Sequence, residues 1–214
     1  MKRCMILIGF VLFFISTAYT NAPFTELKLG YWDPADAKEG VIWGINLGRM
    51  IDESLSWSFE FNYYQKTYSK VTTILDTSFQ SGITPSVVQE ELNYKTYIIP
   101  VFLKLNWERQ LGNPSPFFLR ASAGLGWGMV WNRETNFFTD ETSTRFYHGF
   151  GWQGNLGLGF QISSSANLFI DGMYNSSKPK RGKGTTEAGL PTWEELDLSG
   201  FGVRVGVSIV GFGW

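Results

Sequence analysis

Apolar residues alternate with small or polar residues at a period of two through eight segments of the sequence. The clearest is segment 117–132, whose apolar positions are Phe117, Leu119, Ala121, Ala123, Leu125, Trp127, Met129 and Trp131. Most residues between them are Gly or small and polar. Period two is the spacing of a β-strand with two different faces, and no long segment has the 3.6-residue period of a helix. We therefore expect an all-β chain with eight strands.

The composition of the two faces predicts which one is turned outward. Charged residues make up only 17% of the chain, against about 25% in typical soluble domains, and aromatic residues make up another 17%. The polar face is rich in Gly, Ser, Asn and Gln, which suits a narrow interior better than a water-exposed surface. The apolar face suits hydrocarbon. Because lipid cannot satisfy free backbone groups, the sheet must close, which predicts an eight-stranded antiparallel up-and-down transmembrane β-barrel.

The first 22 residues have the three parts of a secretory signal peptide. Lys2 and Arg3 are followed by an apolar run over residues 5–15 and a small, polar tail. The run is too short to span a bilayer as a helix. Cleavage is expected after Ala18 or after Ala22, and we assign residues 1–22 to the leader and residues 23–214 to the barrel.

The lengths of the connections predict the orientation of the barrel. Short connections at 50–54, 109–116 and 164–166 alternate with long ones at 70–91, 133–147 and 176–195, and the eight-residue connection 33–40 is the exception. Outer-membrane barrels place short turns in the periplasm and long loops outside. We therefore expect both termini in the periplasm and the long loops outside the cell. Loop 70–91 is rich in apolar residues, which favours extension of its flanking strands over a partner-binding patch.

Six charged side chains fall on the inward face of the expected strands. They are Lys28, Glu60, Lys104, Arg120, Asp171 and Arg204. An eight-stranded barrel is just wide enough inside for side chains, and buried charges occur when they are paired. We expect a plug of paired charges, with a gate or ion path as the alternative. In the last segment the apolar positions change parity at Val210, which predicts a β-bulge there. Pro100 has no N–H to donate, which predicts a local break in strand pairing.

Composition excludes several classes of function. The formal net charge of −1 leaves no basic footprint for nucleic acid. The single Cys, Cys4, lies in the leader and the single His is His148, so we expect neither a metal site nor a cofactor. The one candidate catalytic group in the sequence is a Ser/His/Glu cluster of Ser143, His148 and Glu141 in and beside one loop. We expect that the chain is not an enzyme.

The stretch IIPVFLKLNW at 98–107, together with the terminal aromatic residue Trp214 after VGFG, resembles the small outer-membrane barrels of Gram-negative bacteria. This family includes the transmembrane domain of outer-membrane protein A. The resemblance implies that Phe212 and Trp214 form the signal read by the barrel assembly machinery. It also implies that a lipid A deacylase would carry Ser two residues after the His, where this chain has Phe150.

The partners that we expect are outer-membrane lipid, lipopolysaccharide and the assembly machinery, with the chain acting as a monomer. Lipopolysaccharide phosphates could pair with Lys178, Lys180, Arg181 and Lys183, although a solvated loop fits these residues equally well. The expected role is structural or surface display. The alternatives are a narrow channel for small or hydrophobic solutes, an adhesin or receptor acting through the long loops, and a secreted lipocalin-like carrier.

Overall fold

The computed structural model describes residues 22–75, 86–112, 115–137, 139–185 and 191–212. Within these ranges the strands are β1 (Pro23–Pro34), β2 (Gly40–Met50), β3 (Leu55–Leu75), β4 (Ser86–Gln110), β5 (Phe117–Asn136), β6 (Glu141–Ser163), β7 (Ala166–Ser177), β8 (Lys180–Thr185), β9 (Pro191–Glu195) and β10 (Gly200–Val210). No helix capable of crossing a membrane occurs in these ranges. All but the last residue of the expected leader lies outside the described residues.

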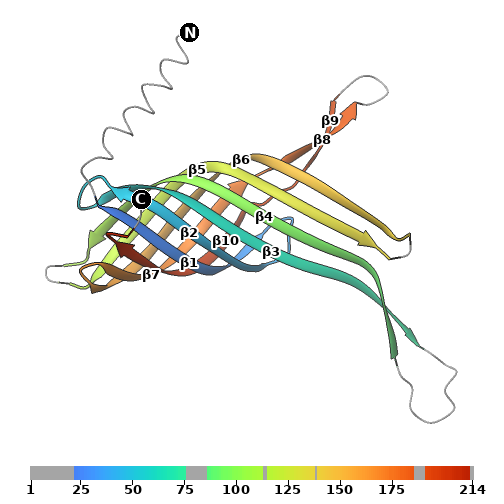
Figure 1. Cartoon of the computed structure of the whole chain (residues 1–214), viewed down its shortest axis with the longest axis horizontal. Helices are drawn as coiled ribbons and strands as arrows, with labels where there is room; N and C mark the ends of the chain where they lie inside the picture. Colours follow the sequence, from blue (N-terminus) through green and yellow to red (C-terminus); the bar gives the residue numbers. More distant parts are fainter. Residues whose placement is uncertain (1–21, 76–85, 113–114, 138, 186–190, 213–214) are drawn as a thin grey trace, which may run out of the picture.

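Eight of the strands close into a barrel (Figure 1). The order around the ring is β1–β2–β3–β4–β5–β6–β7–β10, with every neighbouring pair antiparallel, and the β1–β10 ladder closes the circle. Strands β8 and β9 form a separate hairpin that touches the edge of β6 at the pair His148–Lys180. The expected eight-stranded barrel is confirmed, with one additional hairpin inserted between β7 and β10.

The wall of the barrel is apolar outside and polar inside. Leu125, Leu156 and Phe201 expose 60%, 63% and 73% of their surface on the outside. Charged and amide side chains such as Glu60 and Asn46 are completely buried on the inside. An apolar outer wall of this extent requires hydrocarbon around it, so the barrel spans a membrane. A lipocalin-like carrier has the opposite arrangement, and that alternative is wrong.

Aromatic pairs lie near both ends of the apolar wall. Trp43 packs against Tyr63 toward one end, and Phe117 packs against Phe160 toward the other, with ring centroids 5.2 and 5.3 Å apart. Such bands are typical of the two membrane–water boundaries. We call the end with connections 35–39, 76–85, 137–140 and 178–199 the long-connection end. The short-connection end has connections 51–54, 111–116 and 164–165 and the start of β1.

Glycine on the inner face makes room for large side chains of the neighbouring strand. A Cβ atom on Gly159 would collide with the Phe118 ring, and one on Gly206 would collide with the Phe169 ring. Any larger residue at these two positions would require the ring to move. The Gly-rich inner face that the sequence shows is therefore a consequence of filling a narrow lumen.

Two of the expected long loops are mostly strand, which corrects the sequence prediction. Pairing of β3 with β4 continues to Leu75 and Ser86, and pairing of β5 with β6 continues to Asn136 and Glu141. Extension of the flanking strands is thus confirmed for loop 70–91. Segment 176–195 likewise contains β8 and β9. The sequence revealed neither the extension of β5 and β6 nor the β8–β9 hairpin because, beyond the membrane, neither face needs to be consistently apolar.

Two local irregularities were expected, and one of them is present. The β3–β4 ladder lapses beside Pro100, between the pairs Phe61–Val101 and Tyr64–Ile98, because proline has no N–H to donate. The bulge expected near Val210 is absent, since the β1–β10 ladder runs without a register shift to the end of β10. Val210 still pairs with Phe24, and the chain turns only after it, at Gly211, whose φ is 83°.

Candidate functional site

All six charged residues expected on the inner face are buried in the lumen, each exposing at most 5% of its surface. They come from six strands, β1, β3, β4, β5, β7 and β10. Strand alternation fixes their inward direction, since each has the parity opposite to the exposed apolar residues of its strand. Most lie in the half of the barrel nearer the short-connection end, where their side chains meet across the lumen.

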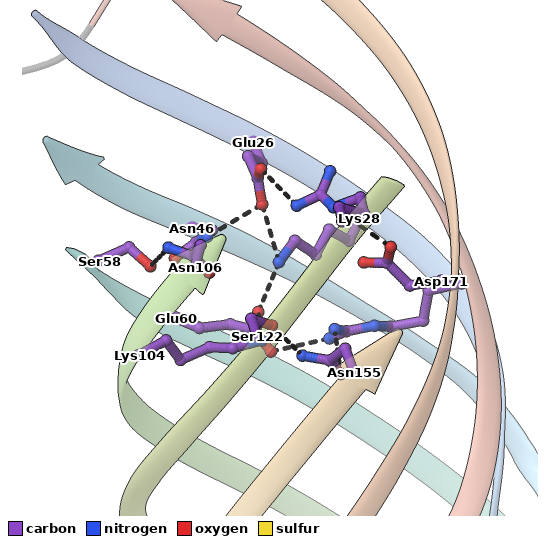
Figure 2. A network of polar contacts seen from close by, with 12 residues as sticks. Glu26, Lys28, Asn46, Ser58, Glu60, Lys104, Asn106, Ser122, Asn155 and Asp171 are labelled. Carbon is purple, nitrogen blue, oxygen red and sulfur yellow. Dashed lines mark hydrogen bonds and ion pairs between the residues drawn. The ribbon is translucent and has the colours of Figure 1, made fainter. Parts of the chain in front are cut away.

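Glu60 on β3 is the centre of the charged network. Its carboxylate pairs with Lys28 Nζ at 2.6 Å, with Lys104 Nζ at 2.9 Å and with Arg204 Nη1 at 2.8 Å. Asn62 Nδ2 donates a further hydrogen bond to it at 2.9 Å. Figure 2 shows Lys28 reaching between Glu26 and Glu60. One carboxylate therefore joins three other strands across the lumen.

Glu26 is a second centre, which the sequence analysis missed. It accepts bonds from Arg120 Nη2 at 2.7 Å and Asn46 Nδ2 at 2.9 Å, and it lies 2.9 Å from Lys28 Nζ. The sequence contains the information needed to place Glu26 in the lumen, because Glu26 has the same parity as Lys28 on the first strand. The expected first strand began at Leu27, whereas β1 begins at Pro23, so one inward position was left out.

The pairing partners differ from simple neighbour relations. Asp171 and Arg204 lie directly opposite each other on β7 and β10. Nevertheless Arg204 reaches Glu60, while Asp171 lies 3.3 Å from Arg120 Nε. Arginine side chains are long enough to cross the lumen, so the carboxylate that each meets depends on three-dimensional packing. Arg120 Cζ also lies over the Phe169 ring, 3.7 Å from its centroid.

The charges of the network nearly balance. Among the buried described residues it contains four cations, Lys28, Lys104, Arg120 and Arg204, and three carboxylates, Glu26, Glu60 and Asp171. A fourth carboxylate, Glu108, is 31% exposed and lies 3.9 Å from Arg120 at the rim. Charges removed from water in this way are tolerated because each has an opposite partner.

A second, apolar layer fills the lumen toward the long-connection end, and the sequence analysis did not foresee it. Its buried members are Trp32, Ile42, Tyr64, Ile98, Val130, Tyr147, Met173 and Leu198. Seven of them point inward from barrel strands, and Leu198 comes from the segment between β9 and β10. Ile42 and Ile98 adjoin outward apolar residues, so alternation was obscured at those positions.

The four basic residues expected to meet lipopolysaccharide each face a carboxylate of this chain. Lys178 lies 3.1 Å from Asp197, Lys180 lies 2.8 Å from Glu195, and Lys183 lies 2.5 Å from Glu194. Arg181 is 3.8 Å from the same Glu194. The hydrogen bond from Lys183 lowers the pKa of Glu194, and the bond to Asp197 raises the pKa of Lys178. The hairpin is therefore largely neutral in charge.

The expected assembly signal is only partly within the described residues. Phe212 is exposed, and its carbonyl oxygen accepts a bond from Thr25 Oγ1 at 2.8 Å. Gly211 N also donates to Pro23 O at 2.7 Å, so the last described residues are held against the start of β1. Trp214 lies outside the described residues.

The structure does not assemble the possible hydrolase cluster. His148 points outward and stacks on Trp127 at 5.6 Å, whereas Ser143 and Glu141 have the opposite parity on the same strand. Ser143 is also five residues away, about 17 Å along an extended strand. No group of three or more His, Cys, Asp and Glu suited to a metal ion occurs in the described part of the chain.

These features together identify the fold: a closed antiparallel ring of eight strands, an apolar outer wall between aromatic bands, and a charged interior. This is the fold of a small outer-membrane β-barrel. No protein-family model matches the sequence, and no curated protein matches it.

Three solved outer-membrane proteins are similar to this chain in structure. OprG from Pseudomonas aeruginosa has 12% identity and a TM-score of 0.58, covering 92% of this chain and 99% of its own. A major outer membrane protein from Thermus thermophilus has 9% identity and a TM-score of 0.57, covering 90% and 100%. Neisserial surface protein A has 12% identity and a TM-score of 0.52, covering 88% and 96%. At these low sequence identities the similarity to the three proteins shows a shared fold and does not show a shared function.

Proposed function

We propose that this chain is an integral protein of a bacterial outer membrane with a closed lumen and a structural or surface-display role. The observation that carries the proposal is the buried network in which Glu60 and Glu26 bind cations from facing strands. The apolar layer above it supplies a second closure. Two different layers in series, as the described residues form them, support a lumen without a polar path. The similar solved structures are outer-membrane proteins, which supports the location.

The proposal includes the orientation and assembly of the barrel. Both termini would lie in the periplasm and the extended hairpins outside the cell, as the connection lengths indicate. Phe212 and Trp214 would form the signal for the barrel assembly machinery, and the barrel would act as a monomer without enzymatic activity. Removing Trp214 should lower the yield of membrane-inserted protein, while insertion at the wild-type level would place the signal elsewhere.

Swelling of proteoliposomes in small sugars tests the closed lumen. Vesicles containing the folded protein should swell no faster than empty vesicles. Swelling that depends on the amount of protein would instead favour the alternative of a narrow channel for small solutes. The apolar layer toward the long-connection end has the polarity that a channel for hydrophobic solutes needs. The side chains of that layer fill the space, however, which argues against such a channel.

An adhesin or receptor is the second candidate, and a specific observation favours it. At the long-connection end β3 to β6 continue as a sheet beyond the barrel, and in Figure 1 the β3–β4 hairpin projects far from it. Pairing of β2 with β3 ends at Ile42–Tyr64. Among the described residues, the β3 edge at 65–69 then has no neighbouring strand on that side. Exposed strand edges are a known means of binding extended segments of partners.

Deleting residues 72–85 separates these two roles. Normal insertion with loss of binding to cells or matrix proteins would establish the adhesin. If the parent protein and the deletion variant behave alike in both assays, the structural role stands. Contact between the basic hairpin and lipopolysaccharide is a weaker part of the proposal, because its cations are already paired.

A further inference from the structure

The outward face of β3 to β6 changes from aromatic to basic at the long-connection end, where these four strands lie side by side (Figure 1). Tyr97 of β4 and Trp131 of β5 are direct neighbours in the ladder and extend the aromatic band at this end. Two residues further along the same strands, Lys95 and Arg133 are direct neighbours in turn. The ladder has no register shift, so both pairs share the outward face of exposed Leu125. The two cations therefore project from the outside of the barrel and not into the lumen.

The depth of this cation pair matches the headgroup layer of a membrane. Two residues of a strand advance by about 7 Å, or by roughly 5 Å along the membrane normal when the strand is tilted as in such barrels. Aromatic bands mark the boundary of the hydrocarbon, and the headgroup layer beyond that boundary is about 5–8 Å thick. Lys95 and Arg133 are both exposed, so their cationic groups lie within reach of that layer.

Lys95 and Arg133 are like charges placed directly opposite each other. Side chains in this position on antiparallel strands have their Cβ atoms about 4.5–5.5 Å apart, and like charges so placed destabilise the sheet. Among the described residues neither cation forms an ion pair with a carboxylate, whereas Arg145 on the other face of the same sheet lies 2.9 Å from Glu134. An anion shared by both cations would replace their repulsion with attraction.

The neighbours of the pair on the same face supply hydroxyl groups and no carboxylate. Thr67 of β3 lies opposite Lys95, and Thr144 of β6 lies opposite Arg133. Both threonines are exposed. A row of two cations between two hydroxyl groups matches a phosphate, which has several acceptor oxygens and a negative charge. The next outward row toward the hairpin tips is also uncharged and consists of Ser69, Asn93, Thr135 and Thr142.

We propose that Lys95 and Arg133 form a binding site for the phosphate group of a membrane lipid at the long-connection end. The planar guanidinium of Arg133 binds two phosphate oxygens, and the ammonium of Lys95 neutralises the remaining charge. In the proposed outer-membrane orientation this lipid is lipopolysaccharide, an identification that rests on the proposed function. The basic residues Lys180 and Lys183 of the β8–β9 hairpin do not compete for the phosphate, because carboxylates of this chain already pair with them.

Native mass spectrometry of the folded protein in a nonionic detergent tests the site. The probe is lipid A with two phosphates, and the same lipid without phosphates gives the background. Lys95→Ala combined with Arg133→Ala should weaken binding of the phosphorylated lipid roughly tenfold or more, because both charges that attract it are removed. Lys180→Ala combined with Lys183→Ala is the matched control. It removes the same charge from cations that are already paired, so binding should change less than about twofold.

Lys95→Glu separates loss of the site from loss of the fold. It places a carboxylate directly opposite Arg133, so binding of the phosphorylated lipid should fall to the background. The barrel should resist heating at least as well as the parent protein, because an opposite-charge pair replaces a like-charge pair. The shift of gel mobility on boiling measures this resistance and verifies that each variant is folded. Retained lipid binding by Lys95→Glu would overturn the proposal.

Equal binding by the parent protein and the double variant of Lys95 and Arg133 also overturns the site. Displacement of the lipid by inorganic phosphate at the same concentration would mean that the site takes a soluble anion, which overturns the assignment to a lipid. Absence of displacement supports it. None of these measurements depends on the lumen. Binding that requires the pair in a barrel that conducts would contradict the closed lumen and leave the site standing, whereas binding that ignores the pair overturns the site alone.

Discussion

At the scale of single residues, alternation predicts which side chains face the lumen but not which partners they meet. Lys104 and Glu60 form the pair that neighbouring strands suggest, whereas Arg204 and Asp171 bind elsewhere. The strand alternation decides whether a side chain points into the lumen. Side-chain length and the mutual repulsion of the cations decide which carboxylate each cation meets. Glu26 was missed only because the expected strand began too late.

Glu60→Ala tests the energetic weight of the network centre. It leaves three buried cations without their shared carboxylate, so we expect a loss of about 3–5 kcal/mol in the free energy of unfolding. Glu108→Ala is the control, because Glu108 is partly exposed at the rim, and it should cost less than about 1 kcal/mol. Urea unfolding of the folded protein in detergent measures both. Equal losses would mean that Glu60 has no central role.

Gly159→Ala tests the close packing of the inner face. Its Cβ would collide with the Phe118 ring, and we expect a destabilisation of about 1–3 kcal/mol. Gly182→Ala on β8 meets no atom within 4 Å and should change stability by less than about 0.5 kcal/mol. The midpoint of the heat-induced gel shift compares the two. A tolerated alanine at position 159 would show that the ring has space to move.

The segment of residues 196–199, which continues the ladders of β10 at the long-connection end, should loosen in acid. Hydrogen bonds from Ser199 and the pair with Lys178 hold the pKa of Asp197 below its usual 3.8. A lowered pKa means that the carboxylate stabilises the hydrogen-bonded form of this segment above pH 3.8, and that this contribution disappears as the pH falls through the lowered value. Amide exchange of Leu198, corrected for its intrinsic rate, should therefore be flat near neutral pH and rise in strong acid. A rise beginning near neutrality would point to another group.

At the scale of elements, the sequence predicts the membrane-spanning parts of the strands and, among their extensions, only that of the two strands flanking loop 70–91. Hydrocarbon on one side imposes apolar residues at every second position, as in β5. Beyond the membrane this requirement ends, so the outer parts of β3 and β4 have mixed composition although their pairing continues to Leu75–Ser86. Short strands such as β8 and β9 carry too few residues for a period to be visible.

The β8–β9 hairpin carries a prediction about anionic ligands. Because Lys180 and Lys183 are paired within the hairpin, replacing both with Ala should change binding to lipopolysaccharide less than about twofold. Glu194→Gln with Glu195→Gln should increase binding, since it leaves the cations without carboxylates. Co-sedimentation with lipopolysaccharide vesicles measures each variant. A large loss in the lysine variant would instead make these cations a binding site.

At the scale of the whole molecule, closure follows from the surroundings of the sheet. A sheet with an apolar outer face in a membrane cannot leave an edge, which is why the eight-stranded barrel was predictable from period and composition. The filling of the lumen was predictable only in part. The charged residues could be identified by parity, whereas members of the apolar layer such as Ile42 and Ile98 adjoin outward apolar residues and are hidden in the alternation.

Current through the folded protein in a planar bilayer tests the closed lumen most directly. With the Glu60 network and the apolar layer both in place, we expect no stable conductance steps above those of the bare bilayer at neutral pH. Glu60→Ala should remain silent wherever it folds, because the apolar layer still blocks the lumen. Large, stable steps from the wild-type protein would contradict the account.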